Sequence, residues 1–319
     1  MISLVIPSFN EEESILHTAK YIKSVLSEAQ IPYEIIFVND GSSDTTWDKI
    51  LEITSQDTQV RGICFSRNFG KEACMFAGLR AAKGDCCVVL DCDLQHPPET
   101  IVEMYRLWKD EGFEVIEGVK RSRGKESLGY KLSAGAFYKI MSLCIGFDMA
   151  SSSDFKLLDR KVVDTLCAMP ERETFFRAMS FWVGYKTTKV EYDVAAREFG
   201  TTKWSLTKLI RYAVTNMTSF SSAPLQLVTW LGTFLLIGSA ILGLQTLFNW
   251  ITGNAVEGFT TVILILLLTS GCIMISLGII GYYISKIYIE IKGRPRYIIT
   301  QTTPAEVKDA IQDTARLDK

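Results

Sequence analysis

The sequence predicts an α/β protein with a mostly parallel β-sheet, followed by two transmembrane helices. Over residues 2–90, short apolar runs alternate with segments of helical spacing, which is typical of βαβ units. The apolar runs are continuous, as expected for strands that helices cover on both faces. Farther along, Glu257 is the one charged residue between positions 212 and 285.

Four strands and three helices are predicted at the N-terminal end of the chain. The strands are residues 2–7 (ISLVIP), 33–38 (YEIIFV), 60–65 (VRGICF) and 86–90 (CCVVL). The helices are residues 11–29, which have an acidic first turn, a helix capped by Ser43 and Asp44 that ends near residue 55, and residues 71–82. The crossovers between parallel strands should be right-handed.

Residues 100–220 continue as mixed α/β structure with fewer clear strands. A strand is predicted at 116–120, a helix at 127–145, and an amphipathic helix from residue 209 that would lie on a membrane surface. The predicted division is a cytosolic domain (1–208), a juxtamembrane helix (209–225), a two-helix membrane domain (226–285) and a cytosolic tail (286–319).

The two apolar stretches are predicted to span a membrane near residues 226–250 and 259–285. Each holds the ~20 apolar residues that a bilayer requires, whereas soluble core helices, the alternative, rarely run this long without charge. Basic residues flank the pair on both outer sides, and the loop between the spans has none. Both termini and the N-terminal domain are therefore expected in the cytoplasm. The N-terminus lacks the basic start of a signal peptide.

Composition excludes two other classes of site. The net charge of −2 and the pI of about 5.9 give no basic field for nucleic acid. The eight cysteines show no C-x-x-C pair and no zinc spacing, so we expect them to be reduced and mostly buried.

Polar clusters follow all four of the first strands. Asn10-Glu11, Asn39-Asp40, Ser66-Arg67-Asn68 and Asp91-Cys92-Asp93 stand at these strand ends. Ligands bind beyond the carboxyl ends of strands in open α/β sheets, so these clusters predict one site. In VVLDCDLQHP, residues 88–97, the two carboxylates fit either an ordinary polar turn or a metal site.

Several strings resemble a known family. VIPSFNEEE, VNDGSSDTT, FSRNFGKE and DCDLQHPPE resemble family 2 glycosyltransferases, which have the Rossmann-like GT-A fold. SSSDFKLLDR, REFGTTKWS and the two spans narrow the resemblance to polyprenyl-phosphate glycosyltransferases of the bactoprenol glucosyltransferase type, related to dolichol-phosphate mannose synthase. The resemblance covers residues 1–300. It departs at Cys92, where the family often has alanine.

The resemblance implies an enzyme of the bacterial inner membrane. It would transfer a hexose, glucose first and N-acetylglucosamine next, from a UDP-sugar to undecaprenyl phosphate on the cytoplasmic face, with inversion. The Q-x-x-R-W string of processive synthases does not occur, which favours a single transfer. The alternatives are mannose transfer from GDP-mannose and a non-catalytic membrane adaptor with a GT-A-like binding domain.

The resemblance also assigns a metal site and a nucleotide pocket. Asp93 and Gln95 would bind Mg²⁺ or Mn²⁺, with Asp91 near both the metal and the ribose. Asp40 would accept a hydrogen bond from uracil. The remaining donor-binding candidates are Pro7, Glu11, Arg67, Lys71, Arg197, Thr202 and Lys203. Glu11 could instead be a helix-dipole partner, and Arg67 and Lys71 solvated helix-end charges.

Cations are also needed for the acceptor, and Arg121 and Lys131 are the candidates for its phosphate. Asp154 stands where many relatives place a catalytic base. A phosphate is already ionised near neutral pH, so a positioning role for Asp154 stays open. Small residues in both spans, such as Ser239 and Gly243, favour a homo-oligomer in the membrane, with a tetramer as one candidate.

Overall fold

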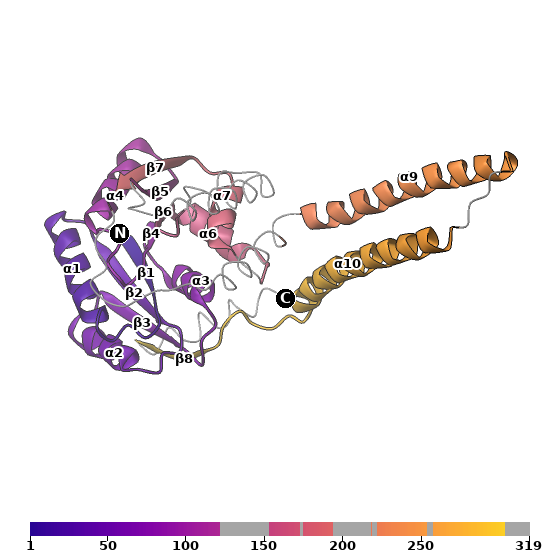
Figure 1. Ribbon diagram of the computed structural model, residues 1–319. Helices are drawn as coiled ribbons and strands as arrows, with labels where there is room; N and C mark the ends of the chain where they lie inside the picture. Colours follow the sequence, from indigo (N-terminus) through magenta and orange to yellow (C-terminus); the bar gives the residue numbers. More distant parts are fainter. Residues whose placement is uncertain (122–152, 173–174, 194–217, 219–221, 254–257, 304–319) are drawn as a thin grey trace. The chain divides into compact units, whose positions relative to one another are not determined.

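A computed structural model describes residues 1–121, 153–172, 175–193, 218, 222–253 and 258–303. The chain divides into two units, residues 1–205 with 294–319, and residues 206–293. The first contains a mixed sheet between helices, and the second contains two long helices (Figure 1).

The sheet of the first unit has eight strands in the order β7-β5-β6-β4-β1-β2-β3-β8. The strands are β1 (Ile2–Ser8), β2 (Tyr33–Asn39), β3 (Val60–Phe65), β4 (Cys86–Val89), β5 (Val115–Lys120), β6 (Lys156–Asp159), β7 (Thr187–Tyr192) and β8 (Ile299–Thr303). The four central strands β4-β1-β2-β3 are parallel, with Leu4 opposite both Ile35 and Val88. Strands β6 and β8 run antiparallel to their neighbours, so the sheet is mixed around a parallel centre.

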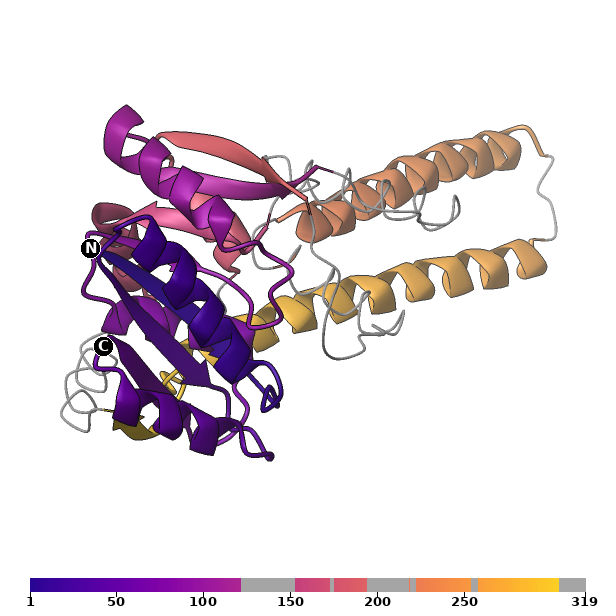
Figure 2. The same ribbon diagram turned by 90° about the vertical axis from the view of Figure 1, so that its left-hand side faces the viewer.

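Helices cover both faces of this sheet (Figures 1 and 2). One layer contains α1 (Ile15–Glu28), α2 (Thr46–Gln56) and α4 (Glu99–Glu111), and the other contains α3 (Lys71–Ala81), α6 (Arg160–Ala168) and α7 (Phe176–Trp182). Strand β2 is completely buried and β1 is buried except at Pro7, which explains why both sequences are largely apolar. A Cβ on Gly78 of α3 would lie 2.2 Å from Cγ1 of Val5, so glycine allows α3 to approach β1 closely.

The predicted elements of residues 1–90 are confirmed, with small shifts at the ends. The first helix begins at Ile15 rather than at residue 11, because the acidic segment forms a turn. Among the described residues between 99 and 193, the sequence predicted the strand at 116–120, and α4, β6, α6, α7 and β7 were not predicted. The predicted helix at 127–145 lies outside the described residues.

The C-terminal tail differs from the prediction. It was expected to be a separate segment from residue 286, but α10 continues to Ile291 and β8 pairs with β3 as the edge strand of the sheet. Tyr297 stacks on Phe65 with ring centroids 5.0 Å apart, and Trp47 donates a hydrogen bond to Gln301 at 2.7 Å. Apolar and polar contacts together make β8 part of the first unit's sheet.

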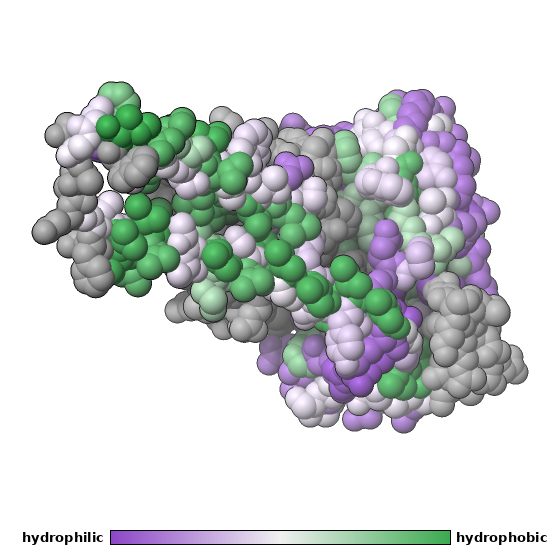
Figure 3. All heavy atoms as spheres, turned by 90° about the vertical axis from the view of Figure 1, so that its right-hand side faces the viewer, coloured by the Kyte–Doolittle hydropathy of each residue, from purple (hydrophilic) through white to green (hydrophobic). Residues whose placement is uncertain are grey.

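Within the described residues, the second unit contains the helices α9 (Ala223–Ile251) and α10 (Phe259–Ile291). Both are long and apolar enough to cross a membrane, with mean hydropathies of 2.0 and 2.6 over their apolar parts. Figure 3 shows apolar side chains covering these helices, and Leu236 and Leu267 are 71% and 66% exposed. Core helices of soluble proteins bury such side chains. The helix α9 begins at Ala223, inside the segment predicted as juxtamembrane, and most of that segment lies outside the described residues.

Candidate active site

The candidate site lies where the strand order of the sheet reverses. After β1 the chain passes through α1 to β2 on one side, and after β3 it returns through α3 to β4 on the other side of β1. The crevice beyond the carboxyl ends of two such strands is the usual ligand site of an open α/β sheet. Asp91 follows β4 at this point.

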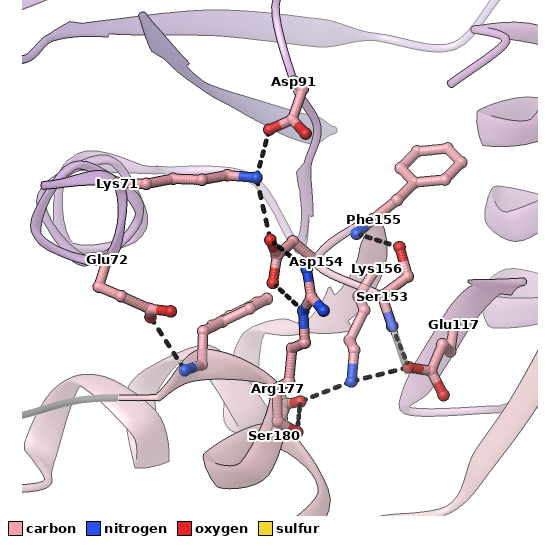
Figure 4. A network of polar contacts seen from close by, with 11 residues as sticks. Lys71, Glu72, Asp91, Glu117, Ser153, Asp154, Phe155, Lys156, Arg177 and Ser180 are labelled. Atoms are coloured by element: carbon pink, nitrogen blue, oxygen red, sulfur yellow. Dashed lines mark hydrogen bonds and ion pairs between the residues drawn. The ribbon is translucent and has the colours of Figure 1, made fainter. Parts of the chain in front are cut away.

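Four charged side chains meet at this point: Asp91, Lys71, Asp154 and Arg177 (Figure 4). The Nζ atom of Lys71 lies 2.5 Å from Oδ1 of Asp91 and 2.9 Å from Oδ2 of Asp154. Arg177 donates two hydrogen bonds to Asp154, from Nε to Oδ1 at 2.7 Å and from Nη2 to Oδ2 at 2.9 Å. Two carboxylates and two cations therefore alternate in one chain of contacts.

Strand direction explains why residues so distant in sequence meet. Strand β6 is antiparallel to β4, with Lys156 opposite Val89, so the residues before Lys156 lie beside those after Val89. This register brings Asp154 next to Asp91. Lys71 is the first residue of α3, and its helix position directs the side chain toward both carboxylates.

Electrostatics keep these groups charged. Burial alone would raise the pKa of Asp154, but Lys71 and Arg177 outweigh it and hold this pKa well below its usual value. The pKa of Asp91 is lowered for the same reason, since the effect of burial is outweighed by Lys71. A carboxylate held in its ionised form this strongly is a poor proton acceptor near pH 7. Asp154 is therefore better suited to holding cations than to acting as a base.

Glu72 is the neighbouring acid with the opposite behaviour. Burial, together with the charge of Asp154, raises the pKa of Glu72 to about 8, although the amide N–H of Phe176 donates a hydrogen bond to its Oε2 at 2.9 Å. Glu72 is consequently protonated and uncharged over most of the neutral range. It joins the start of α3 to the start of α7, the helix that carries Arg177.

A buried ion pair supports the segment that carries Asp154. The Nζ atom of Lys156 lies 3.1 Å from Oε1 of Glu117 and donates a hydrogen bond to Ser180 at 2.8 Å. The same Oε1 accepts a hydrogen bond from the amide of Ser153 at 2.9 Å. These contacts fix the backbone on both sides of Asp154 to β5 and α7 (Figure 4).

The loop after β4 carries the predicted metal ligands. The amide of Gln95 donates a hydrogen bond to Oδ1 of Asp93 at 3.2 Å, and Leu94 between them has a φ of 53°. Cys92 points the other way, into the core against Ser14 of the α1 N-cap, and burial raises the pKa of its thiol to about 12. The alternation of side chains thus separates the thiol from the two aspartates.

The residues present fit a hard divalent cation. Carboxylate and amide oxygens of Asp91, Asp93 and Gln95 are the donors that Mg²⁺ and Mn²⁺ prefer. The Lys71 ammonium shows that a positive charge is held at Asp91. Within the part of the chain that the structure describes, no three His, Cys, Asp or Glu side chains are grouped closely enough to form a metal cluster.

The predicted nucleotide-binding residues lie on neighbouring loops. Asp40 follows β2, and its carboxylate accepts hydrogen bonds from the amides of Phe69 and Gly70, the shortest at 2.7 Å. Gly41 has a φ of 65°, and a Cβ there would lie 2.4 Å from the backbone carbon of Arg67. Asp40 thus holds the loop that ends at Lys71. Burial raises its pKa overall, despite these hydrogen bonds.

The other donor candidates flank this pocket. Pro7 lies in β1 opposite Val38, and Glu11 accepts a hydrogen bond from Ser14 at 2.6 Å at the start of α1. The guanidinium of Arg67 lies over the Phe69 ring at 4.1 Å. Arg197, Thr202 and Lys203 lie outside the described residues.

Of the two acceptor candidates, Arg121 is described and Lys131 lies outside the described residues. Arg121 follows β5 and contacts Asp193 at 3.1 Å and Glu191 at 3.5 Å, with its side chain 59% exposed. It lies at the same end of the sheet as Asp91, since β5 runs parallel to β4 through the shared antiparallel neighbour β6.

Sequence reasoning missed Arg177, Lys156 and Glu117. Their roles depend on contacts across 23 or more residues, such as the Arg177–Asp154 pair, which no local spacing predicts. Glu72 stood in the quoted string FSRNFGKE and was assigned no role.

Similarity to known proteins extends over most of this chain. Residues 3–167 match the model of the family described as glycosyl transferase family 2. An uncharacterized glycosyltransferase, YkcC, of Bacillus subtilis (strain 168) is 38% identical over 98% of this chain and 97% of its own length. The SfII prophage-derived bactoprenol glucosyl transferase of Shigella flexneri is 36% identical over 94% of this chain and 98% of its own length.

A solved structure, that of glucosyl-3-phosphoglycerate synthase from Mycobacterium tuberculosis with Mn²⁺, UDP-glucose and phosphoglyceric acid, is a more distant likeness. It is 19% identical, covers 68% of this chain and 77% of its own, and has a TM-score of 0.46. The family match, together with relatives that align over nearly the full length of both chains, shows that this chain belongs to glycosyl transferase family 2 and is a glycosyltransferase.

Proposed function

We propose that this enzyme transfers one hexose, glucose in the first place, from a UDP-sugar to undecaprenyl phosphate. The observation that carries the proposal is similarity to bactoprenol glucosyl transferases along 94% of the chain, a span that includes both apolar helices. The alternating cluster of carboxylates and cations at the strand ends is suited to a reaction between two phosphate-bearing substrates.

The donor would bind in the crevice between β1 and β4. Asp40 at the end of β2 would face the uracil, and Pro7 and Glu11 would form the pocket wall. A divalent cation held by Asp91, Asp93 and Gln95 would neutralise charge on the leaving diphosphate. The cations proposed for the diphosphate itself are Lys71, Arg197 and Lys203.

The acceptor would bring an oxygen that is already ionised. A lipid phosphate with a second pKa of about 6 carries the nucleophilic charge near neutral pH, so no side chain has to remove a proton. That oxygen would bond to the anomeric carbon while the bond from this carbon to the diphosphate breaks, which inverts the configuration. Asp154 would act as a positioning residue for Lys71 and Arg177, and Arg121 and Lys131 would hold the acceptor phosphate.

The apolar helices α9 and α10 would anchor the enzyme in the bacterial inner membrane. The basic residues outside both helices favour a cytoplasmic catalytic unit and cytoplasmic termini. The exposed apolar faces of both helices are compatible with packing against further copies, so we propose a homo-oligomer, a tetramer among the candidates. Crosslinking in native membranes that recovers only monomer would exclude it.

One assay tests the reaction. Membranes containing the full-length enzyme are incubated with undecaprenyl phosphate, Mg²⁺ or Mn²⁺, and labelled UDP-glucose, UDP-N-acetylglucosamine or GDP-mannose, and the lipid is extracted. We expect labelled lipid from UDP-glucose, loss of labelling with EDTA, and loss with Asp93→Ala. Asp110→Ala, at an exposed acid of α4, is the control and should keep full transfer.

Each other outcome identifies the error. Full transfer by Asp93→Ala would exclude the metal assignment. Labelling only from UDP-N-acetylglucosamine or only from GDP-mannose would change the donor. A protein that binds UDP but labels no lipid with any donor would be the binding adaptor rather than this enzyme.

A further inference from the structure

The four charged groups at the centre of the site neutralise one another. Asp91 and Asp154 carry two negative charges, and Lys71 and Arg177 carry two positive charges, with every contact between them at 2.9 Å or less. The Lys71 ammonium bridges both carboxylates, and Arg177 donates two hydrogen bonds to Asp154. Lys71 is therefore the cation that satisfies Asp91.

Asp91 also belongs to the proposed metal site, so two cations compete for it. A divalent cation at Asp91 and Asp93 would lie close to the Lys71 ammonium and be repelled by it. It would also have to displace the 2.5 Å contact between Lys71 and Asp91. In the absence of a donor, both effects weaken metal binding.

A movement of Lys71 away from Asp91 would not leave Asp154 unpaired. The Lys71 side chain is 39% exposed, and lysine carries a compact charge on a flexible stem. Arg177 keeps two hydrogen bonds to Asp154 when Lys71 moves away, at 2.7 and 2.9 Å. A diphosphate in the crevice would supply the negative charge that both Lys71 and the metal require.

We propose that Lys71 couples metal binding to donor binding by occupying Asp91 until a nucleoside diphosphate draws it away. The inference rests on the proposed function in one respect, that the donor carries a diphosphate. The physical consequence is that metal alone binds weakly, and that the nucleotide strengthens metal binding by more than its own direct contacts to the ion.

The test measures Mn²⁺ binding rather than transfer. Free Mn²⁺ is titrated by electron paramagnetic resonance against full-length enzyme in detergent, with and without saturating UDP. We expect Lys71→Met to bind Mn²⁺ alone about tenfold more tightly than the wild type, because a nearby repelling charge is removed. The gain in Mn²⁺ affinity on adding UDP should shrink in the same variant.

Four further variants complete the experiment. Lys71→Arg keeps the charge and should keep weak binding of Mn²⁺ alone, and Lys71→Gln repeats the neutral substitution should the methionine variant not fold. Lys49→Met removes a lysine from an exposed pair on α2, 3.3 Å from Glu52, and should bind Mn²⁺ as the wild type does. Asp93→Ala should abolish the tight binding of Mn²⁺ that is expected in the presence of UDP.

The inference would be overturned if Lys71→Met and Lys71→Gln both bound Mn²⁺ alone no more tightly than the wild type. It would also be overturned if Lys49→Met gained as much affinity for Mn²⁺ as the Lys71 variants. Absence of Mn²⁺ binding to every form would overturn it as well. These results are independent of the lipid-labelling assay. An enzyme that labels lipid while its neutral Lys71 variants show no gain in metal affinity refutes the coupling and leaves the proposed function standing.

Discussion

Replacement of Arg177 by alanine should destabilise the catalytic unit and displace Asp154. The substitution removes two hydrogen bonds of 2.7 and 2.9 Å from a carboxylate that is 12% exposed. Removing one partner of a buried ion pair costs about 3–5 kcal/mol. Because Lys71 retains its 2.9 Å contact to Asp154, we expect the lower value, about 3 kcal/mol in the free energy of unfolding.

The measurement is urea unfolding of the full-length enzyme in detergent, read by the fraction of the catalytic unit that resists a short protease pulse. Arg177→Lys can keep one of the two hydrogen bonds, so its free energy of unfolding should fall by half as much, roughly 1.5 kcal/mol. Arg106→Ala, in an exposed pair 3.3 Å from Glu111, is the matched control and should stay within about 0.5 kcal/mol of the wild type. Transfer by Arg177→Ala should fall about 100-fold, since Asp154 and Lys71 lose their geometry.

Two results would contradict this role of Arg177. If Arg177→Ala unfolds within about 0.5 kcal/mol of the wild type, the guanidinium does not hold Asp154 in solution. If stability falls as expected but transfer is unchanged, the pair supports the fold and does not position the site.

The remaining predictions concern pH, the buried ion pair and packing. The pKa of Glu72 is raised from its ordinary 4.5 to about 8, so the native state retains a proton that the unfolded chain releases, and the stability from this group falls as pH rises from about 4.5 to 8. The melting temperature of Glu72→Gln should therefore depend less on pH over this range than that of the wild type. The same pH dependence in both proteins would contradict the raised pKa of Glu72. Lys156→Met should lose about 3–5 kcal/mol on urea unfolding, because it leaves the buried carboxylate of Glu117 without its cation. Adding Glu117→Gln should recover part of that loss, whereas additive losses would exclude the coupling. Gly78→Ala should cost about 1–3 kcal/mol through overlap with Val5, and an unchanged melting temperature would show that α3 can move aside.

Local patterns in the sequence were sufficient for the central half of the fold. Strand β3 was predicted at its observed bounds, Val60–Phe65, because a short, mostly apolar run between two helical segments is typical of a strand in a parallel sheet. The short strand β6 was missed, since four residues give too little periodicity to distinguish strand from loop. Strand β8 was missed because it is mostly polar, with Thr300 and Gln301 exposed at the sheet edge, and because its contacts to β3 cross more than 230 residues.

The same distinction applies to the site. Asp40, Asp91 and Asp93 were predicted because they directly follow apolar strands, and parallel strands place such positions at one edge. Arg177 could not be found in this way, because its function depends on how α7 packs against the segment before β6. Asp154 was found from the resemblance to the family, and its partners came from the structure.

The sequence by itself determined the order of strands and helices over residues 1–90, the two apolar spans, the family and the acids at the strand ends, because these follow from local patterns and from residues adjacent to their own strands. Only the tertiary structure decided what the acids contact. It joined Asp91 to Asp154 through Lys71, paired Asp154 with Arg177, and raised the pKa of Glu72 while lowering that of Asp154. Burial and the distance between charges set these properties, and both arise only when segments remote in sequence pack together.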